Sequence, residues 1–165
     1  MVQCDVFEVK VDLEDESGRP YLVWTFHTDL LAGTQVILAC ERTFSDMLGA
    51  TCLWTGHNER LEVHPNVHGN YNGANGRIEV YASDKKAREL FEEISTGSAP
   101  AIKTPVSDEM ILSFTVGARQ KLRAYGRNNT ELRGKMVSAN GDINVVVVSK
   151  SICIPMQREL QPLDM

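Results

Sequence analysis

The sequence predicts an all-β fold, a two-sheet antiparallel sandwich that carries one short amphipathic helix. In most apolar segments the apolar residues recur at every second position, which is the repeat of a β-strand. Residues 84–95 carry the apolar repeat of a helix, and strands and helices do not alternate regularly along the chain. A parallel sheet with crossover helices is therefore not expected, and two half-apolar sheets must cover each other.

The chain of 165 residues has the length of one domain, and we expect a single sandwich over residues 1–165. Residues 155–165 contain two prolines and are expected to form a surface tail. The first residues lack the features of a secretory signal, and no apolar run is long enough to span a membrane. These features favour a cytoplasmic protein that does not enter a membrane.

The first predicted strand, residues 5–13, places four apolar side chains on one face: Phe7, Val9, Val11 and Leu13. A charged turn follows, and aromatic and β-branched residues predict a second strand at 21–28, paired with the first as a hairpin. The acidic cluster of this turn, residues 12–16, is interpreted as a solvated turn, with a calcium site as the alternative. Further short strands are expected at residues 35–40, 50–55, 61–64 and 77–83.

One helix is predicted at residues 84–95, with four apolar residues on one stripe: Ala87, Leu90, Phe91 and Ile94. Ser83 or Asp84 is expected to cap its start, and Gly97 to end it. A loop rich in Pro, Gly and Ser is expected next, at 96–105.

The last part of the chain predicts more strands. Residues 109–116 are typical of one, and Asn140-Gly141 lies between two β-branched runs. Because these two residues tolerate positive φ, they predict the tight turn of a β-hairpin.

Four cysteines, Cys4, Cys40, Cys52 and Cys153, lie far apart in apolar segments. In a reducing compartment they are expected to be buried free thiols. Two disulfides remain the alternative for an exported protein.

The stretch HTDLLAGTQVILACERT, with Thr28, Leu30, Gly33 and Thr34, resembles a hairpin of bacterial immunoglobulin-like sandwich domains over residues 28–43. In those domains a Thr-x-Leu-Pro-x-Gly-Thr stretch leads into a strand, and here Leu31 stands in place of the proline. The resemblance implies a β-sandwich without enzymatic activity, and it transfers no functional residue.

The stretch HPNVHGNYNGANGR, residues 64–77, is interpreted mainly as a loop between two strands. His64 and His68 have the spacing of half a zinc site, and His57 precedes them. Solvent-exposed histidines are the simpler interpretation, because no close cysteine pair accompanies them. The glycine spacing does not match a phosphate-binding loop. No metal and no cofactor is therefore expected.

Positive charge gathers in residues 119–135, which hold six basic residues and one acidic residue in a chain of net charge −5. If residues 119–127 formed a strand, one face would carry Arg119, Lys121, Arg123, Tyr125 and Arg127. Such a row is typical of a protected edge strand, of a surface that meets an acidic partner, or of a nucleic-acid site with a stacking aromatic.

No catalytic motif is found in the sequence, and no catalytic residue is assigned. We expect a non-catalytic interaction or assembly module that binds a protein partner or itself. Binding of nucleic acid or another polyanion through the basic row is the alternative. A metal-dependent enzyme that uses the three histidines is the third hypothesis.

Overall fold

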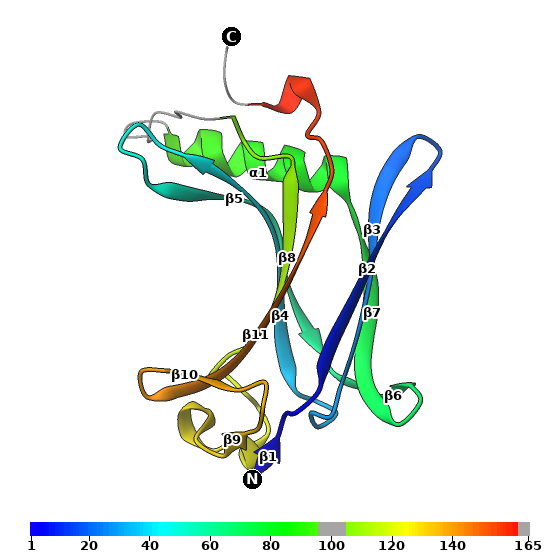
Figure 1. The fold of residues 1–165 in the computed structure, drawn as a ribbon, viewed down its shortest axis with the longest axis vertical. Coiled ribbons are helices and arrows are strands. Elements are labelled where there is room, and N and C mark those ends of the chain that lie inside the picture. Colours follow the sequence, from blue (N-terminus) through cyan, green and yellow to red (C-terminus); the bar gives the residue numbers. More distant parts are fainter. Residues whose placement is uncertain (96–104, 162–165) are drawn as a thin grey trace.

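The computed structural model describes residues 1–95 and 105–161, with residues 66–68 and 93–95 described by their backbone alone. It confirms a mostly β fold with two antiparallel sheets and one helix (Figure 1). The four-stranded sheet has the order β2 (Phe7–Glu16), β3 (Arg19–Thr28), β7 (Tyr71–Glu79) and β6 (His64–His68). The five-stranded sheet has the order β10 (Ser138–Asn140), β11 (Ile143–Cys153), β8 (Glu109–Val116), β4 (Gln35–Ser45) and β5 (Thr51–Glu62).

The core lies between the inner faces of these two sheets. Alternate residues of β3, β4 and β8 are buried, as the period-two pattern predicts. An aromatic cluster joins the layers, because the ring of Phe114 meets the rings of Trp24 and Phe26 edge to face, with centroids 5.5 and 5.6 Å apart. This geometry suits the quadrupoles of aromatic rings and adds to the burial of apolar area.

The β2–β3 hairpin is confirmed and is longer than expected. Its pairing runs from Phe7 opposite Thr28 to Glu16 opposite Arg19. The turn consists of Ser17 and Gly18, whose φ values of 54° and 78° are those of a tight two-residue turn. The acidic cluster therefore lies on a strand that projects beyond the rest of the sheet (Figure 1).

The segment that resembles a hairpin of immunoglobulin-like domains connects the two sheets. β3 belongs to the four-stranded sheet and β4 to the five-stranded sheet, so the connection between them is a crossover rather than a hairpin. Asp29 anchors it by accepting hydrogen bonds from the backbone amides of Asp5 and Val6. Thr34, the last residue of the connection, leads directly into β4.

Residues 64–77 are two paired strands rather than a loop. β6 and β7 form a hairpin in which His68 lies opposite Tyr71, with Gly69 and Asn70 between them. The glycines have a packing role: a Cβ at Gly76 would lie 2.5 Å from the Trp24 ring, and one at Gly73 would lie 2.0 Å from the Phe26 carbonyl oxygen. Gly73 and Gly76 are therefore residues of a strand, and the interpretation of this stretch as a loop is wrong for both.

Two predicted strands, 50–55 and 61–64, are replaced by one, because β5 continues through residues 51–62. Its pairing with β4 shifts register at Cys40, which lies opposite His57, while Glu41 lies opposite Thr55. Gly56 is thus the extra residue of a β-bulge. A Cβ there would lie 2.0 Å from the Ser83 carbonyl oxygen, so glycine lets the helix approach this strand.

Helix α1 (Val80–Ser95) begins four residues earlier than predicted. Residues 80–83 are its first turn, so the strand predicted at 77–83 is wrong over most of its length. Ser83 and Asp84 lie inside the helix and face the core rather than capping its start. Val80 and Ile78 are both buried, so the apolar pattern continues across the boundary and gives no signal of where the strand ends.

A buried ion pair fixes α1 to the five-stranded sheet. Arg42 on β4 is fully buried and binds Asp84 through two hydrogen bonds of 2.7 and 3.0 Å. Its remaining amino group donates to the backbone carbonyls of Ser107 and Ile154, at 3.0 and 2.6 Å. Burial raises the pKa of the Asp84 carboxyl, and the hydrogen bonds and charge of Arg42 partly offset this rise. One guanidinium group therefore joins four segments of the chain.

The carboxyl-terminal segment packs against this end of the sandwich. Met156 is buried beside Phe44 and Trp54, and Leu160 packs on the same cluster. The expectation of a surface tail at 155–165 is therefore wrong for Met156, while residues 162–165 lie outside the described residues. The predicted loop at 96–105 also lies outside them, except for its last residue.

All four cysteines are free thiols. Cys4 and Cys40 are buried as expected, whereas Cys52 is half-buried and Cys153 is exposed. Across the described ranges, no helix has both the length and the apolar character that crossing a membrane requires.

Candidate anion-binding surface

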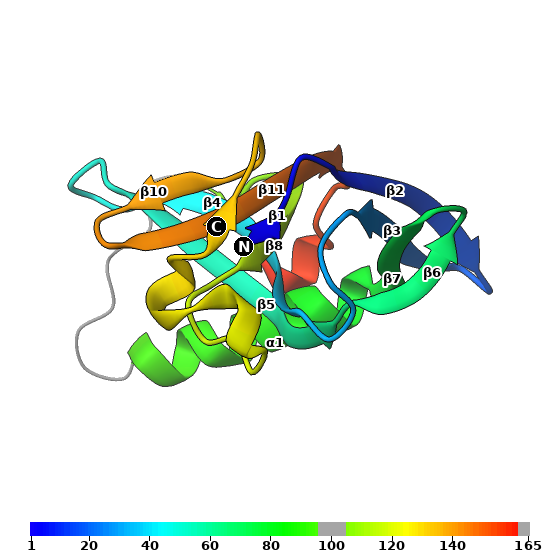
Figure 2. The same cartoon turned by 90° about the horizontal axis from the view of Figure 1, so that it is seen from below.

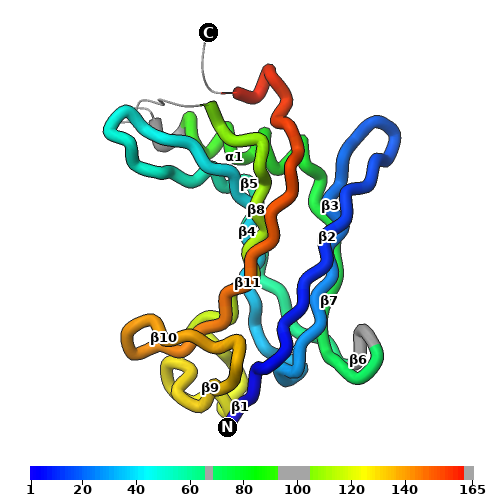
Figure 3. The backbone as a smooth tube through the Cα atoms, viewed as in Figure 1, coloured from blue at the N-terminus to red at the C-terminus, as the bar shows by residue number. Residues whose placement is uncertain are grey.

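Residues 117–137 connect β8 to β10 and close the end of the sandwich opposite α1 (Figure 3). The strand expected at 119–127 is wrong: this segment contains two 3-10 turns, Arg123–Tyr125 and Arg127–Asn129. Gly126 between them has a φ of 69°, and Asn129 has a φ of 59°. A β-strand cannot contain such values, so the alternation of side chains that the prediction assumed does not exist here.

Tyr125 anchors this loop to the sandwich. Its side chain is fully buried, and its hydroxyl donates a hydrogen bond to Thr34 Oγ1. Thr34 in turn donates to the carbonyl oxygen of Leu31, at 2.7 Å. Burial raises the pKa of the Tyr125 phenol to about 12. Tyr125 therefore points away from the arginines with which it was grouped, and its ring cannot stack on a base.

Asn129 is the second anchor. Its amide nitrogen donates to the carbonyl oxygen of Gly117 at 2.7 Å and to that of Asn144 at 3.0 Å. These bonds tie the loop to the end of β8 and to the start of β11. Leu132 is fully buried as well, and with Arg133 it forms β9 (Leu132–Arg133), which pairs in parallel with β1 (Val2–Gln3).

The basic side chains of the loop point into solvent. We call residues 117–135 the basic loop, because six cations in it are exposed: Arg119, Lys121, Arg123, Arg127, Arg133 and Lys135. Within the described residues, none of the six forms an ion pair. The acidic residue of the loop, Glu131, lies 3.9 Å from the amino terminus. The inward residues thus hold the loop, and the outward residues leave their charges at the surface.

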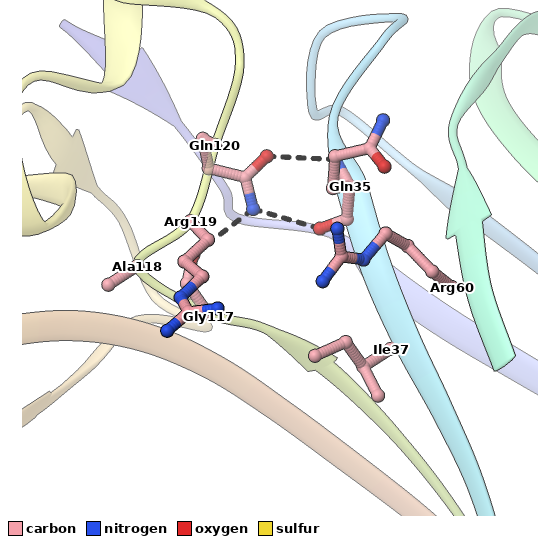
Figure 4. Close-up of a pocket in the computed structure, with 7 residues that line it drawn as sticks. All are labelled: Gln35, Ile37, Arg60, Gly117, Ala118, Arg119 and Gln120. Carbon is pink, nitrogen blue, oxygen red and sulfur yellow. Dashed lines mark hydrogen bonds between the residues drawn. The ribbon is translucent and has the colours of Figure 1, made fainter. Parts of the chain in front are cut away.

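A shallow pocket of about 90 Å³ lies where the basic loop meets β4 and β5 (Figure 4). Arg119 lines it from the loop, and Arg60 lines it from β5 on the opposite side. Ile37 forms its apolar floor, because Ile37 lies directly opposite Arg60 in the β4–β5 pairing. Both guanidinium groups are exposed and, within the described ranges, form no ion pair.

Gln120 fixes the position of this pocket. Its carbonyl oxygen accepts a hydrogen bond of 2.8 Å from the Gln35 amide, and its amide nitrogen donates to the Gln35 carbonyl at 2.8 Å (Figure 4). The same amide nitrogen also donates a hydrogen bond to the backbone carbonyl oxygen of Gly117, at 3.1 Å. The Gln120 side chain thus bonds to the start of β4 in the way that the backbone of a neighbouring strand would. These bonds fix the position of the loop segment that contains Arg119.

The arrangement is suited to a carboxylate or a phosphate group. Two guanidinium groups beside an apolar floor can donate several hydrogen bonds to one anion, and arginine forms such bonds in pairs. The charge pattern of the sequence indicates Arg119 but not Arg60. Nothing in the local sequence of Arg60 marks it, because only the pairing of β4 with β5 and the return of the loop bring it to Arg119.

Two of the three histidines considered as metal ligands, His57 and His64, lie on different sheets. His57 lies on β5 and binds Glu59 on the same strand at 2.9 Å, whereas His64 is exposed on β6 of the other sheet. His68 also belongs to β6, but its side chain lies outside the described residues. Among the residues that the structure describes, no group of three potential metal ligands is close enough to hold an ion.

No protein-family model matches the chain, and comparisons with curated proteins and with solved structures likewise find no match. The resemblance of residues 28–43 to immunoglobulin-like domains therefore stays a prediction.

Proposed function

We propose that the protein is a non-catalytic interaction module that binds an acidic surface of a protein partner through its basic loop. The observation that carries this proposal is the division of side chains in the loop. Tyr125, Asn129 and Leu132 are buried and hold it, while six cations remain exposed and without an ion pair in the described part of the chain. A held and locally positive surface favours fast and specific encounter with a negative one.

The pocket between Arg60 and Arg119 gives this surface a specific contact. We place an aspartate or glutamate carboxylate of the partner there, bound by both guanidinium groups above Ile37. The alternative, nucleic acid, loses support because the aromatic residue of the predicted row is buried. Tyr125 cannot supply the stacking that single-stranded nucleic acids use.

The test compares two labelled probes, a poly-glutamate peptide and a single-stranded DNA oligonucleotide, by fluorescence anisotropy at low and moderate salt. Arg123→Glu is the test variant, and Lys85→Glu on the exposed surface of α1 is the matched control. We expect peptide binding that weakens with salt, that falls about tenfold or more in Arg123→Glu, and that the control leaves unchanged. Tighter binding of DNA, or equal losses in the two variants, would contradict the proposal.

A cytoplasmic location belongs to the same proposal. It is supported by four thiols that form no disulfide, two of them in the core. Alkylation of the denatured protein as isolated from its native source, without reductant, is expected to modify all four cysteines. A mass that shows only two modified thiols, or none, would contradict a reducing compartment.

A further inference from the structure

The outer strands are β2 and β6 in the four-stranded sheet, and β5 and the short β10 in the five-stranded sheet. β10 covers only three residues of β11, so most of β11 forms the edge on that side of the sheet. Sheet edges expose unpaired backbone amides and carbonyls, which attract further strands unless charge, proline or a bulge prevents pairing. The four edges differ in these protective features.

Three of the four edges are protected. β2 carries alternating charges, including Glu8, Lys10 and Asp12. β6 has five residues, one of which is Pro65. β5 contains the bulge at Gly56 and ends in a charged stretch that includes Arg60. Each of these features opposes the addition of a strand.

β11 lacks this protection. Its residues 146–153 pair with β8 on one side without a register shift, and no strand of the described residues pairs with their other side. Lys150 is the single charged residue in this segment, and no proline interrupts it. Val147, on the outer face of this segment, is 54% exposed. Valine also strongly favours strand formation.

We propose that the free edge of β11 pairs with the same edge of a second copy, antiparallel, about a twofold axis at Ser149. The two five-stranded sheets then join into one continuous sheet. This inference does not rest on the proposed binding of an acidic partner, because it uses a different surface.

The register follows from side-chain alternation. Directly opposed residues of antiparallel strands lie on the same face, so a twofold axis normal to the sheet must lie midway between the two copies of one residue. An axis at Lys150 would set two ammonium groups against each other. An axis at Ser149 pairs residues 146–152 of the two copies, which is the longest uncovered stretch that keeps the two ammonium groups apart. It sets Lys150 opposite Val148 and Val147 opposite Ser151.

Charge at the two ends of the molecule favours the antiparallel arrangement. Figure 2 shows β2 and β11 along the same side of the sandwich. The acidic hairpin tip, which holds Asp12, Glu14, Asp15 and Glu16, lies at the end away from the basic loop. Antiparallel pairing reverses the second copy, so the acidic tip of each copy lies at the level of the basic loop of the other. Parallel pairing would bring like ends together.

The first test measures the mass of the full chain in solution by light scattering over the micromolar concentration range. We expect a species of twice 18.4 kDa. Ser149→Lys sets two added charges opposite each other at the axis and is expected to give the single-chain mass. Asn58→Lys, an exposed position on β5 at the other edge of the same sheet, is expected to leave the dimer intact. A wild-type chain that stays at 18.4 kDa throughout would overturn the proposal.

The second test fixes the register and works even if a charge variant folds poorly. In a Cys153→Ser background, Ser149→Cys places two thiols opposite each other, and mild oxidation is expected to yield a cross-linked dimer. Val147→Cys in the same background is the control, since its two copies would lie about 13 Å apart along the strands, beyond the reach of a disulfide. Equal cross-linking of both variants, or none at Ser149→Cys, would overturn the proposed pairing.

Discussion

The two ends of the sandwich are closed in different ways. At one end α1 is fixed by Arg42 and Asp84, which are both buried and fully bonded to each other. At the other end the basic loop is fixed by neutral groups, Tyr125 and Asn129, and its charges lie in solvent. Charge therefore has two roles in this chain. A buried charge must be paired and serves the fold, whereas an exposed unpaired charge costs little and is free to meet a partner.

Alkaline pH is expected to have the largest effect, because three neutral buried groups act together. Burial raises the pKa of the thiols of Cys4 and Cys40 from 9.0 to about 12, and that of the Tyr125 phenol from 10.0 to about 12. In the unfolded chain these groups ionise at the lower values. Their contribution is therefore complete below about pH 9 and is lost as the pH rises toward 12. Urea unfolding is expected to show no change in stability from these groups between pH 7 and about pH 8, and a progressive fall from about pH 9 to pH 11.

The variant Cys40→Ala provides the control for the alkaline effect. It removes one of the three raised pKa values, so the slope of stability against pH above pH 9 should become less steep, whatever its effect at neutral pH. An unchanged slope would show that the buried thiol does not contribute.

Removal of the buried carboxylate tests the helix end. Asp84→Ala leaves the Arg42 guanidinium buried without its partner, and a loss of about 3–5 kcal/mol in the free energy of unfolding is expected. Glu92→Ala breaks the exposed pair of Glu92 with Arg88 on the same helix and should cost about 0.5 kcal/mol or less. Similar losses in the two variants, measured by urea unfolding, would contradict the structural role of Arg42.

Removal of one hydroxyl tests the loop end. Tyr125→Phe keeps the buried ring and loses the hydrogen bond to Thr34, so a smaller loss of about 1 kcal/mol is expected. Thr34 keeps its bond to the Leu31 carbonyl and is not left without a partner. A loss as large as that of Asp84→Ala in the same urea experiment would mean that the two ends are not held by different strengths of interaction.

Reversal of an exposed charge is expected to have the smallest effect on stability. Arg127→Glu changes a solvent-exposed residue without an ion pair in the described part of the chain, so the unfolding free energy should change by about 0.5 kcal/mol or less. A large decrease in the free energy of unfolding, measured by heat or urea, would show that Arg127 stabilises the fold and contradict its assignment to the binding surface alone.

The sequence was informative where one pattern determines one structure. Strict alternation in β2, β3, β4 and β8 predicted these strands, and the amphipathic stripe predicted α1. The pattern failed at boundaries: the apolar repeat runs on from Ile78 to Val80, although the chain changes from strand to helix there. The Asn140-Gly141 hairpin was also found, with its turn one residue later, at Gly141 and Asp142.

The candidate site was harder to predict, because it depends on contacts between distant segments. The charge of residues 119–135 was evident, but their conformation was not, since it depends on four residues with positive φ: Gly126, Asn128, Asn129 and Gly134. Arg60 enters the site through the pairing of β4 with β5, which no local pattern reports. Likewise, the indole of Trp24 explains Gly76 only once β3 and β7 are side by side.

The most direct test of the account is the affinity of Arg60→Gln for the poly-glutamate peptide. Arg60 lies outside the basic loop, and only the pocket relates it to Arg119. If a carboxylate binds between them, Arg60→Gln and Arg119→Gln should each weaken binding about tenfold, while Lys85→Gln should leave it unchanged. Full affinity in Arg60→Gln, with unfolding free energy equal to that of the wild type, would contradict the proposed pocket.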